Sequence, residues 1–207
     1  GLIRTPQLAQ ELIRAAKLGA GSLPVSVKTR IGWDENELET LLPALLEAEP
    51  AVITIHARTR NELSLVPARW ELVKRAVEIR NAQGSGTLIL GNGDVSSIAD
   101  AQQKAQTTGC DGVMLGRAIF GNPWLFAKPY PHIGPQQKLE ALVEHTKLYE
   151  ELLPHKPFAI MKKHFKSYVA GWDGAKELRI RLMAARNASD VELLSGIAVA
   201  VGADPTK

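Results

Sequence analysis

The sequence contains a single cysteine, Cys110, among its 207 residues. One thiol cannot form a disulfide within the chain, so a disulfide-stabilised fold is excluded. The five histidines are scattered, and no Cys/His cluster has the spacing of metal ligands. We therefore expect no metal site.

Long hydrophobic runs are also missing. No window holds ~18 consecutive apolar residues, the length needed to span a membrane. The first residues lack the basic and apolar regions of a signal peptide, so we expect a soluble, cytoplasmic protein without a membrane partner. A composition of 45% hydrophobic and 23% charged residues excludes disordered and collagen-like chains.

The charge is unevenly distributed. Basic and acidic residues number 13 and 13 in residues 1–121, but 12 and 9 in residues 122–207. Between His155 and Arg186, eight basic side chains face only Asp173 and Glu177. The eight are Lys156, Lys162, Lys163, Lys166, Lys176, Arg179, Arg181 and Arg186. This basic window predicts a polyanionic partner, although a solvated face of an amphipathic helix is the alternative.

The first 120 residues alternate short β-branched segments with longer amphipathic ones, a pattern typical of βα units and a parallel sheet. We expect strands at 24–30, 51–55, 87–90 and 112–115. Helices are expected at 5–19, at 41–50, at 68–81 and from Ser97, where Asp100 completes an approximate capping box.

From Pro135 onward the hydrophobic period is purely helical. Further helices are expected at 158–170, at 174–187 and from Ser189, which would form a capping box with Glu192. The chain therefore divides into an α/β part, residues 1–128, and a small all-α domain, residues 129–207.

Polar segments follow the expected strands. They are residues 28–30 (KTR), 56–60 (HARTR), 91–94 (GNGD) and 116–117 (GR). The carboxyl ends of parallel strands share one rim, so these segments should meet there. Glycines allow a ligand to approach the backbone, and amides near residues 95–97 would face an anion, which predicts a phosphate cup. The alternative for GNGD is a tight turn that needs positive φ.

Two side chains at this rim have competing interpretations. Lys28 ends an apolar strand, and an ammonium group there would stabilise the negative charge of a reduced flavin. It could equally be a lysine neutralised by a salt bridge. His56 is either a ligand contact or a hydrogen-bonded core histidine.

The order of the motifs resembles that of the tRNA-dihydrouridine synthases. The resemblance rests on residues 27–33 (VKTRIGW), 56–60, 91–94, 111–118 (DGVMLGRA) and 121–124 (GNPW). It continues through 161–164 (MKKH) and 174–179 (GAKELR), so it covers nearly the whole chain and is nearest to the bacterial type.

This resemblance implies a flavoprotein oxidoreductase with an FMN-binding TIM (β/α)8 barrel and a helical tRNA-binding domain. NADPH would be the electron donor for reduction of a uridine C5–C6 bond in tRNA. The residues expected to bind the cofactor are Lys28, His56, Asn92, Gly93, Asp94, Gly116 and Arg117. The residues expected to bind RNA are Arg58, Arg60, Lys162, Lys163, Lys166 and Arg179.

The chain departs from the family pattern in length, because we predict four strands where the barrel has eight. We expect the second half of the barrel, four βα units in residues 1–128, followed by the helical tRNA-binding domain in residues 129–207. The family's proton-donating cysteine would lie in the other half, and Cys110 should be an apolar filler. No catalytic residue is then expected in this chain, and the 207 residues alone should be inactive.

Two alternatives remain at this point. One is another FMN-dependent barrel that reduces a free pyrimidine, similar to dihydroorotate dehydrogenase, although the basic helical segment argues against a small-molecule substrate. The other is a non-catalytic RNA-binding remnant.

Overall fold

A computed structural model describes residues 1–202, with side chains as far as residue 196. The chain forms two compact units, Gly1–Arg117 and Ala118–Lys207. The boundary between the units falls after residue 117, whereas a boundary at residue 128 was expected. The segment after Arg117 packs with the helices that follow. A Cβ atom on Gly121, for example, would lie 2.1 Å from the carbonyl oxygen of Ser167.

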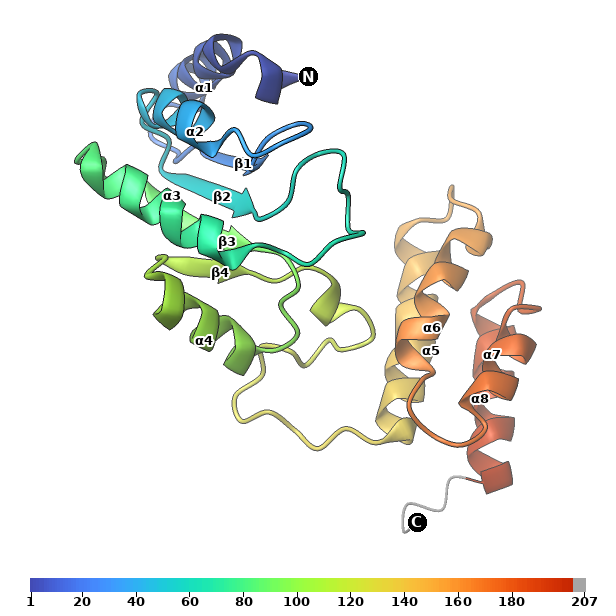
Figure 1. The fold of residues 1–207 in the computed structure, drawn as a ribbon. Helices are drawn as coiled ribbons and strands as arrows, with labels where there is room; N and C mark the ends of the chain where they lie inside the picture. Colours follow the sequence, from blue (N-terminus) through green and yellow to red (C-terminus); the bar gives the residue numbers. More distant parts are fainter. Residues whose placement is uncertain (203–207) are drawn as a thin grey trace. The chain divides into compact units, whose positions relative to one another are not determined.

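The first unit is built on a parallel sheet with the strand order β1-β2-β3-β4 (Figure 1). The strands are β1 (Ser26–Arg30), β2 (Val52–His56), β3 (Leu88–Asn92) and β4 (Gly112–Met114). The helices are η1 (Leu2–Arg4), α1 (Pro6–Ala20), α2 (Leu38–Leu46), α3 (Trp70–Ala82) and α4 (Ile98–Thr108), and η2 (Arg117–Ile119) follows β4. The four predicted strands and the helices between them are confirmed, and the arrangement is consistent with part of a TIM barrel.

The two faces of the sheet differ in character. Ile53, Ile55 and Ile89 are fully buried and belong to one hydrophobic core with Leu42 of α2 and Val73 of α3. Because side chains alternate along a strand, the neighbouring residues belong to the opposite face. The helices therefore cover one face, and the polar residues at the strand ends are left on the other.

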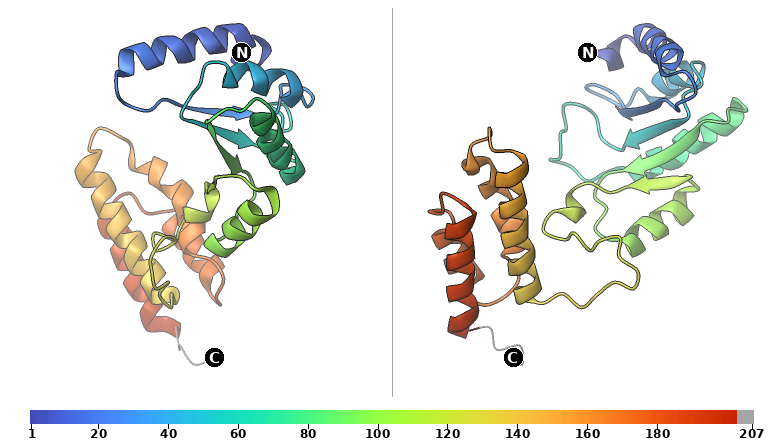
Figure 2. Two further views of the ribbon diagram at one scale, coloured as in Figure 1. Left: turned by 90° about the vertical axis from the view of Figure 1, so that its left-hand side faces the viewer. Right: turned by 180° about the vertical axis from the view of Figure 1, so that it is seen from behind.

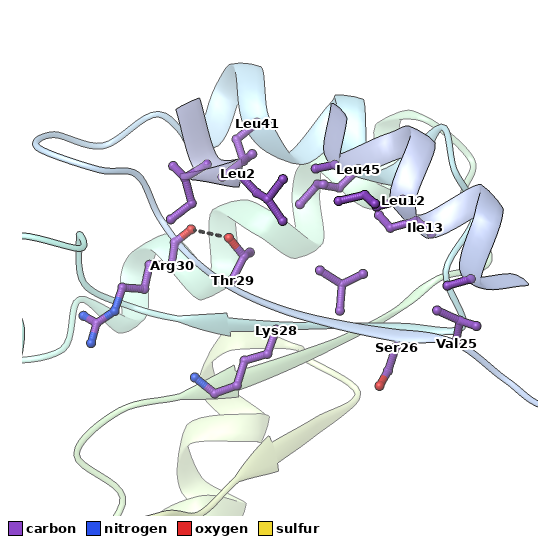
Figure 3. Close-up of a pocket in the computed structure, with 14 residues that line it drawn as sticks. Leu2, Leu12, Ile13, Val25, Ser26, Lys28, Thr29, Arg30, Leu41 and Leu45 are labelled. Carbon is purple, nitrogen blue, oxygen red and sulfur yellow. Dashed lines mark hydrogen bonds between the residues drawn. The ribbon is translucent and has the colours of Figure 1, made fainter. Parts of the chain in front are cut away.

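Strand β1 forms one edge of this sheet, and an apolar pocket of about 520 Å³ lies between it and the helices α1 and α2. Figure 3 shows Ile13, Leu41 and Leu45 on the helical side of β1, whereas Ser26 and Lys28 point to the other side. Lys28 is thus directed away from the apolar core.

The start of α4 partly matches its predicted capping box. The Ser97 hydroxyl accepts a hydrogen bond of 3.1 Å from the amide of Asp100, so Ser97 is the N-cap. The Asp100 carboxylate, however, accepts from the amide of Ser96 at 2.8 Å rather than from that of Ser97. Only one half of the box forms.

The second unit, which Figure 2 shows from two further sides, contains helices only, as far as it is described. They are α5 (Pro135–Leu152), η3 (Phe158–His164), α6 (Phe165–Tyr168), α7 (Ala175–Leu182) and α8 (Ala188–Gly202). Its core includes Leu142, Met161, Phe165, Leu182 and Val191.

The helices predicted at 158–170, at 174–187 and from Ser189 are present, but each differs from the prediction in one detail. Residues 158–164 form a 3₁₀ helix, in which the spacing of Phe158 and Met161 suits three residues per turn. Helix α7 ends at Leu182 rather than at residue 187. The cap of α8 is Asn187, whose side-chain oxygen accepts from the amide of Asp190 at 2.8 Å, because Ser189 already lies within the helix.

Among the described helices, none has the length and apolar character needed to cross a bilayer. The described residues also contain no cluster of three or more His, Cys, Asp or Glu side chains placed to hold a metal ion.

Candidate functional site

Four residues stand in register at the carboxyl ends of the strands. Arg30 pairs with His56, His56 with Asn92, and Asn92 with Met114. All four line a pocket of about 430 Å³. The seven residues expected to bind a cofactor also line this pocket: Lys28, His56, Asn92, Gly93, Asp94, Gly116 and Arg117. Parallel strands whose carboxyl ends are in register thus bring residues from four distant segments together.

The Asp94 carboxylate connects three segments at this rim. One oxygen pairs with the guanidinium of Arg58 and accepts a hydrogen bond of 2.9 Å from the amide of Ala68. The other oxygen accepts from Arg117 at 2.9 Å. The Arg58 hydrogen bond is the main reason why the pKa of Asp94 lies below its ordinary value. The side chain therefore stays ionised and holds two arginines, and only the backbone of Asp94 is free to meet an anion.

Free backbone amides gather beside this carboxylate. Within residues 1–202, the amides of Gly93, Asp94, Val95 and Gly116 have no hydrogen-bond acceptor. The amide of Ser96, by contrast, is bonded to Asp100. Of residues 95–97, where amides facing an anion were expected, only Val95 lines the pocket, together with Gly93 and Asp94.

Residues 91–94 (GNGD) also form the tight turn with positive φ that was the alternative interpretation of this segment. Gly93 has φ = 122° and Asp94 has φ = 50°. A Cβ on Gly93 would lie 2.8 Å from the Cβ of Ala68 and 3.2 Å from Cδ2 of His56. A tight turn and exposed amides coexist here, because the left-handed backbone turns the amides away from the strand ladder.

The pocket carries an excess of positive charge. Lys28, Arg30, Arg58 and Arg117 line it, against the single carboxylate of Asp94. Partial burial, followed by repulsion from Arg30, lowers the pKa of Lys28. Such a site favours an anionic ligand, since cations placed close together are stabilised by a negative partner.

His56 lies between these cations. Its Nε2 is 3.3 Å from Nη1 of Arg58. Burial, followed by repulsion from Arg30, Lys28 and Arg58, lowers its pKa to about 4. The imidazole is therefore neutral near pH 7.

The position of Arg58 does not fit its predicted RNA contact. Its side chain is only 3% exposed, and its guanidinium is bonded to Val66, His56 and Asp94. Arg60, two residues later, is exposed and lies 5.5 Å from the ring centroid of Trp33. Only Arg60 of this pair presents its charge to solvent.

A family model described as dihydrouridine synthase (Dus) matches residues 1–200. This chain belongs to the dihydrouridine synthase family. Over 200 residues it is 40% identical to the probable tRNA-dihydrouridine synthase 2 of Bacillus subtilis, covering 94% of this chain and 60% of that protein. It is 38% identical over 197 residues to the probable tRNA-dihydrouridine synthase of Staphylococcus aureus strain N315, with the same coverage.

The resemblance seen in the motifs is thus confirmed. The probable tRNA-dihydrouridine synthase of Staphylococcus epidermidis strain ATCC 12228 is 40% identical over 186 residues, covering 88% of this chain and 56% of that protein. The chain therefore spans about 60% of the length of the curated relatives it matches.

In this dihydrouridine synthase family member, the four basic residues of the helical unit that were expected to bind RNA fall into two groups. Lys162 donates a hydrogen bond of 2.7 Å to the carbonyl of Met183, and Arg179 donates one of 2.7 Å to that of Val169. Lys163 and Lys166 are exposed and form no ion pair within the described part of the chain. The first group supports the helices, whereas the second is free to meet a polyanion.

Arg30 lines the pocket and belongs to the segment 28–30 expected at the rim, but it was not among the residues expected to bind a cofactor or RNA. Its Nη1 donates to the carbonyls of Thr59 at 2.8 Å and Leu63 at 3.0 Å, which fixes the loop after β2. A sequence signal existed, because residues two apart on a strand share a face, and Lys28 precedes Arg30 by two. Ser64, another lining residue, stands in a loop without such a signal.

Cys110 is 7% exposed and belongs to the core of the first unit. It precedes β4, so it stands at the end of the strand opposite the pocket. Its predicted role as a small core residue is confirmed.

Proposed function

We propose that this chain supplies the FMN phosphate site and the tRNA-binding helices of a tRNA-dihydrouridine synthase. The enzyme would be a flavin-dependent oxidoreductase that uses NADPH to reduce a uridine C5–C6 bond in tRNA. The pocket at the strand ends carries this proposal, because four cations and a set of free amides surround a single, already paired carboxylate.

The residues present fit an FMN phosphate. The amides of Gly93, Asp94 and Gly116 offer hydrogen-bond donors, and Arg117 adds a positive charge. Glycine at position 93 is required, since a Cβ there would collide with Ala68. These groups would hold the phosphate, as donors in a loop commonly hold anions. When bound, FMN would supply the hydride chemistry of the reaction.

Other residues would meet the flavin ring or shape its site. Lys28 would place an ammonium group beside the ring, and His56 would contact it from β2. The side chain of Asn92 donates a hydrogen bond of 2.7 Å to the carbonyl of Met114, so it holds the end of β4 beside β3. Asp94 orients Arg117 toward the pocket.

Recognition of tRNA would depend on the basic helices in residues 129–207. Lys163 and Lys166, with Arg60 of the first unit, would contact phosphates, while Lys162 and Arg179 keep the helices in place. Such contacts supply affinity that depends on salt but carry little sequence information.

We further propose that the 207 residues alone do not reduce uridine. Protonation of the base requires a positioned acid, which typically contributes ~10²–10⁴-fold in rate. His56 is neutral near pH 7, and Cys110 is buried away from the pocket. No other Cys or His lines this pocket in the described chain.

The test compares FMN with riboflavin, which lacks the phosphate. Titration followed by flavin fluorescence should show saturable binding of FMN, competed by inorganic phosphate, and weaker binding of riboflavin. Equal affinity for both would refute the phosphate site. Dihydrouridine formation on unmodified tRNA, with NADPH and excess FMN, should be undetectable for the 207-residue chain, and turnover would disprove the inactivity of this chain alone.

A further inference from the structure

Arg58 is the most buried charged group at the pocket, and each of its nitrogen atoms has a partner. Nε donates to the carbonyl of Val66, Nη2 pairs with Asp94, and Nη1 lies 3.3 Å from Nε2 of His56. A side chain 3% exposed and bonded on three sides has no freedom to reorient.

The contact with His56 determines where the imidazole proton lies. A guanidinium group has five N–H donors, no acceptor, and does not lose its proton in proteins. Nε2 of His56 must therefore be the acceptor, which requires an unprotonated nitrogen. In a neutral imidazole the proton is then on Nδ1.

The surrounding charges favour the neutral ring as well. Lys28 and Arg30 approach from β1 and Arg58 from the loop after β2, whereas Asp94 is the only anion. Burial and these three cations hold the pKa of His56 near 4. In the described residues, Nδ1 of His56 has no hydrogen-bond partner. It is the free donor of the ring.

We propose that Arg58 is a positioning residue that fixes His56 as the neutral Nδ1–H tautomer. His56 thus offers its ligand one donor and no acceptor, so it recognises a hydrogen-bond acceptor such as a carbonyl oxygen of a heterocyclic ring. It acts neither as a general acid nor as a general base near neutral pH. Only the identity of that ring rests on the proposed function.

Arg58 has a second positioning effect. Through its pair with Asp94 it holds the carboxylate that in turn orients Arg117. One buried guanidinium therefore sets the donor offered by His56 and, through Asp94, the orientation of the Arg117 cation in the same pocket.

The tautomer can be measured on the chain without any ligand. Long-range ¹H–¹⁵N correlation spectra distinguish a protonated Nδ1 from a protonated Nε2, and loss of one set of signals in His56→Gln assigns the residue. We expect a single Nδ1–H form near neutral pH. A protonated Nε2, or a mixture of the two forms, would overturn the proposal.

Arg58→Met tests the cause. It removes the donor to Nε2 but leaves Asp94 bonded to Arg117 and Ala68. We expect His56 to populate both tautomers and its pKa to rise, whereas the matched control Arg60→Met should leave the spectrum of His56 unchanged. An unchanged His56 in folded Arg58→Met would contradict the role of Arg58.

If Arg58→Met fails to fold, Arg58→Lys provides the same comparison with the charge retained. A lysine offers a single ammonium in place of the three bonded nitrogens, so it cannot serve both His56 and Asp94. Either His56 should lose its fixed tautomer, or Asp94 should lose its partner and phosphate should bind more weakly. An unchanged His56 spectrum together with an unchanged affinity of the chain for phosphate would contradict the proposal. Because no flavin or RNA is present in the spectra, a chain that fails to bind FMN would refute the proposed function without altering this result.

Discussion

The indole Nε1–H of Trp70 donates a hydrogen bond of 2.9 Å to the carbonyl oxygen of Gly93. The same indole ring fills the space beside Gly91, where an added Cβ would lie 2.3 Å from Cζ3 of Trp70. The first residue of α3 thus holds the turn that presents the free amides of the pocket. The packing of α3 therefore fixes the shape of this turn.

Gly91→Ala should destabilise the first unit. The methyl group would collide with the partly buried ring of Trp70, and overpacking of this kind costs ~1–3 kcal/mol. We expect a lower midpoint in urea unfolding. Gly19→Ala is the control, because Gly19 lies in α1 with open space around its Cα and should gain ~0.5–1 kcal/mol. Equal effects of the two substitutions would show that the contact with Trp70 is unimportant.

Arg117→Gln should weaken FMN binding and leave riboflavin binding unchanged. A hydrogen bond to a charged group contributes ~1.5–3 kcal/mol, which corresponds to roughly a 10- to 100-fold change in affinity. Arg75→Gln is a suitable control, because Arg75 forms surface ion pairs with Glu39 and Glu78. Flavin fluorescence titration provides the measurement, and a parallel loss for riboflavin would mean that Arg117 acts on the ring rather than on the phosphate.

Asp94→Asn should reduce stability, because it leaves the buried guanidinium of Arg58 without its anionic partner. Removing one member of a buried pair costs ~3–5 kcal/mol, and the partial exposure of Asp94 places this case at or below the lower end. The double variant with Arg58→Met should be less destabilised than the sum of the two single variants. Simple additivity in urea unfolding would contradict a direct interaction.

Stability should fall in acid partly because of His56. Its pKa is about 4 in the folded chain and about 6.5 when unfolded, so the unfolded chain binds more protons between these values. The contribution is complete above about pH 6.5 and is lost as the pH falls toward 4. Asp94 stays ionised in this window, because Arg58 lowers its pKa.

His56→Gln should therefore flatten the decline in the urea midpoint between about pH 7 and about pH 4.5. Burial also lowers the pKa values of His145 and His164 in the second unit, but both are present in each protein and cancel in the comparison. Identical slopes for the two proteins would argue against a strongly shifted His56.

Replacing Lys163 and Lys166 by glutamine should weaken tRNA binding and reduce its dependence on salt. Each lost phosphate contact lowers the slope of log K against log salt by ~0.7–0.9. Lys147→Gln is the control, because Lys147 is paired with Glu192. Filter binding at several salt concentrations measures the slope, and an unchanged value would favour the solvated-face interpretation of these lysines.

Arg179→Gln tests the basic residues of the helical unit that bond to backbone carbonyls instead of facing solvent. Its guanidinium donates to the carbonyl of Val169, so the variant should lower the thermal stability of the helical unit. An effect on the salt slope without an effect on stability would instead place Arg179 on the RNA.

Local patterns in the sequence determined the elements of the first unit and the set of residues at its rim. Short β-branched segments alternate along the chain with segments whose apolar residues have helical spacing, which predicts a parallel sheet. The carboxyl ends of parallel strands share one edge, so Lys28, His56, Asn92 and Arg117 had to come together. Neither inference needs knowledge of side-chain partners. Family membership was likewise visible in short motifs, because backbone turns and ligand contacts restrict which residues can stand there.

Tertiary structure alone decided which of the two arginines after His56 is buried. Arg58 and Arg60 have the same local context, and the difference arises from Asp94, 36 residues away, which neutralises Arg58 inside the unit. The sequence also left open which residue caps α8, since both Asn187 and Ser189 could do so. It likewise did not distinguish a 3₁₀ helix from an α-helix at residues 158–164. Patterns along a chain record burial and period, whereas the partner of a charge depends on which distant segments the fold brings into contact.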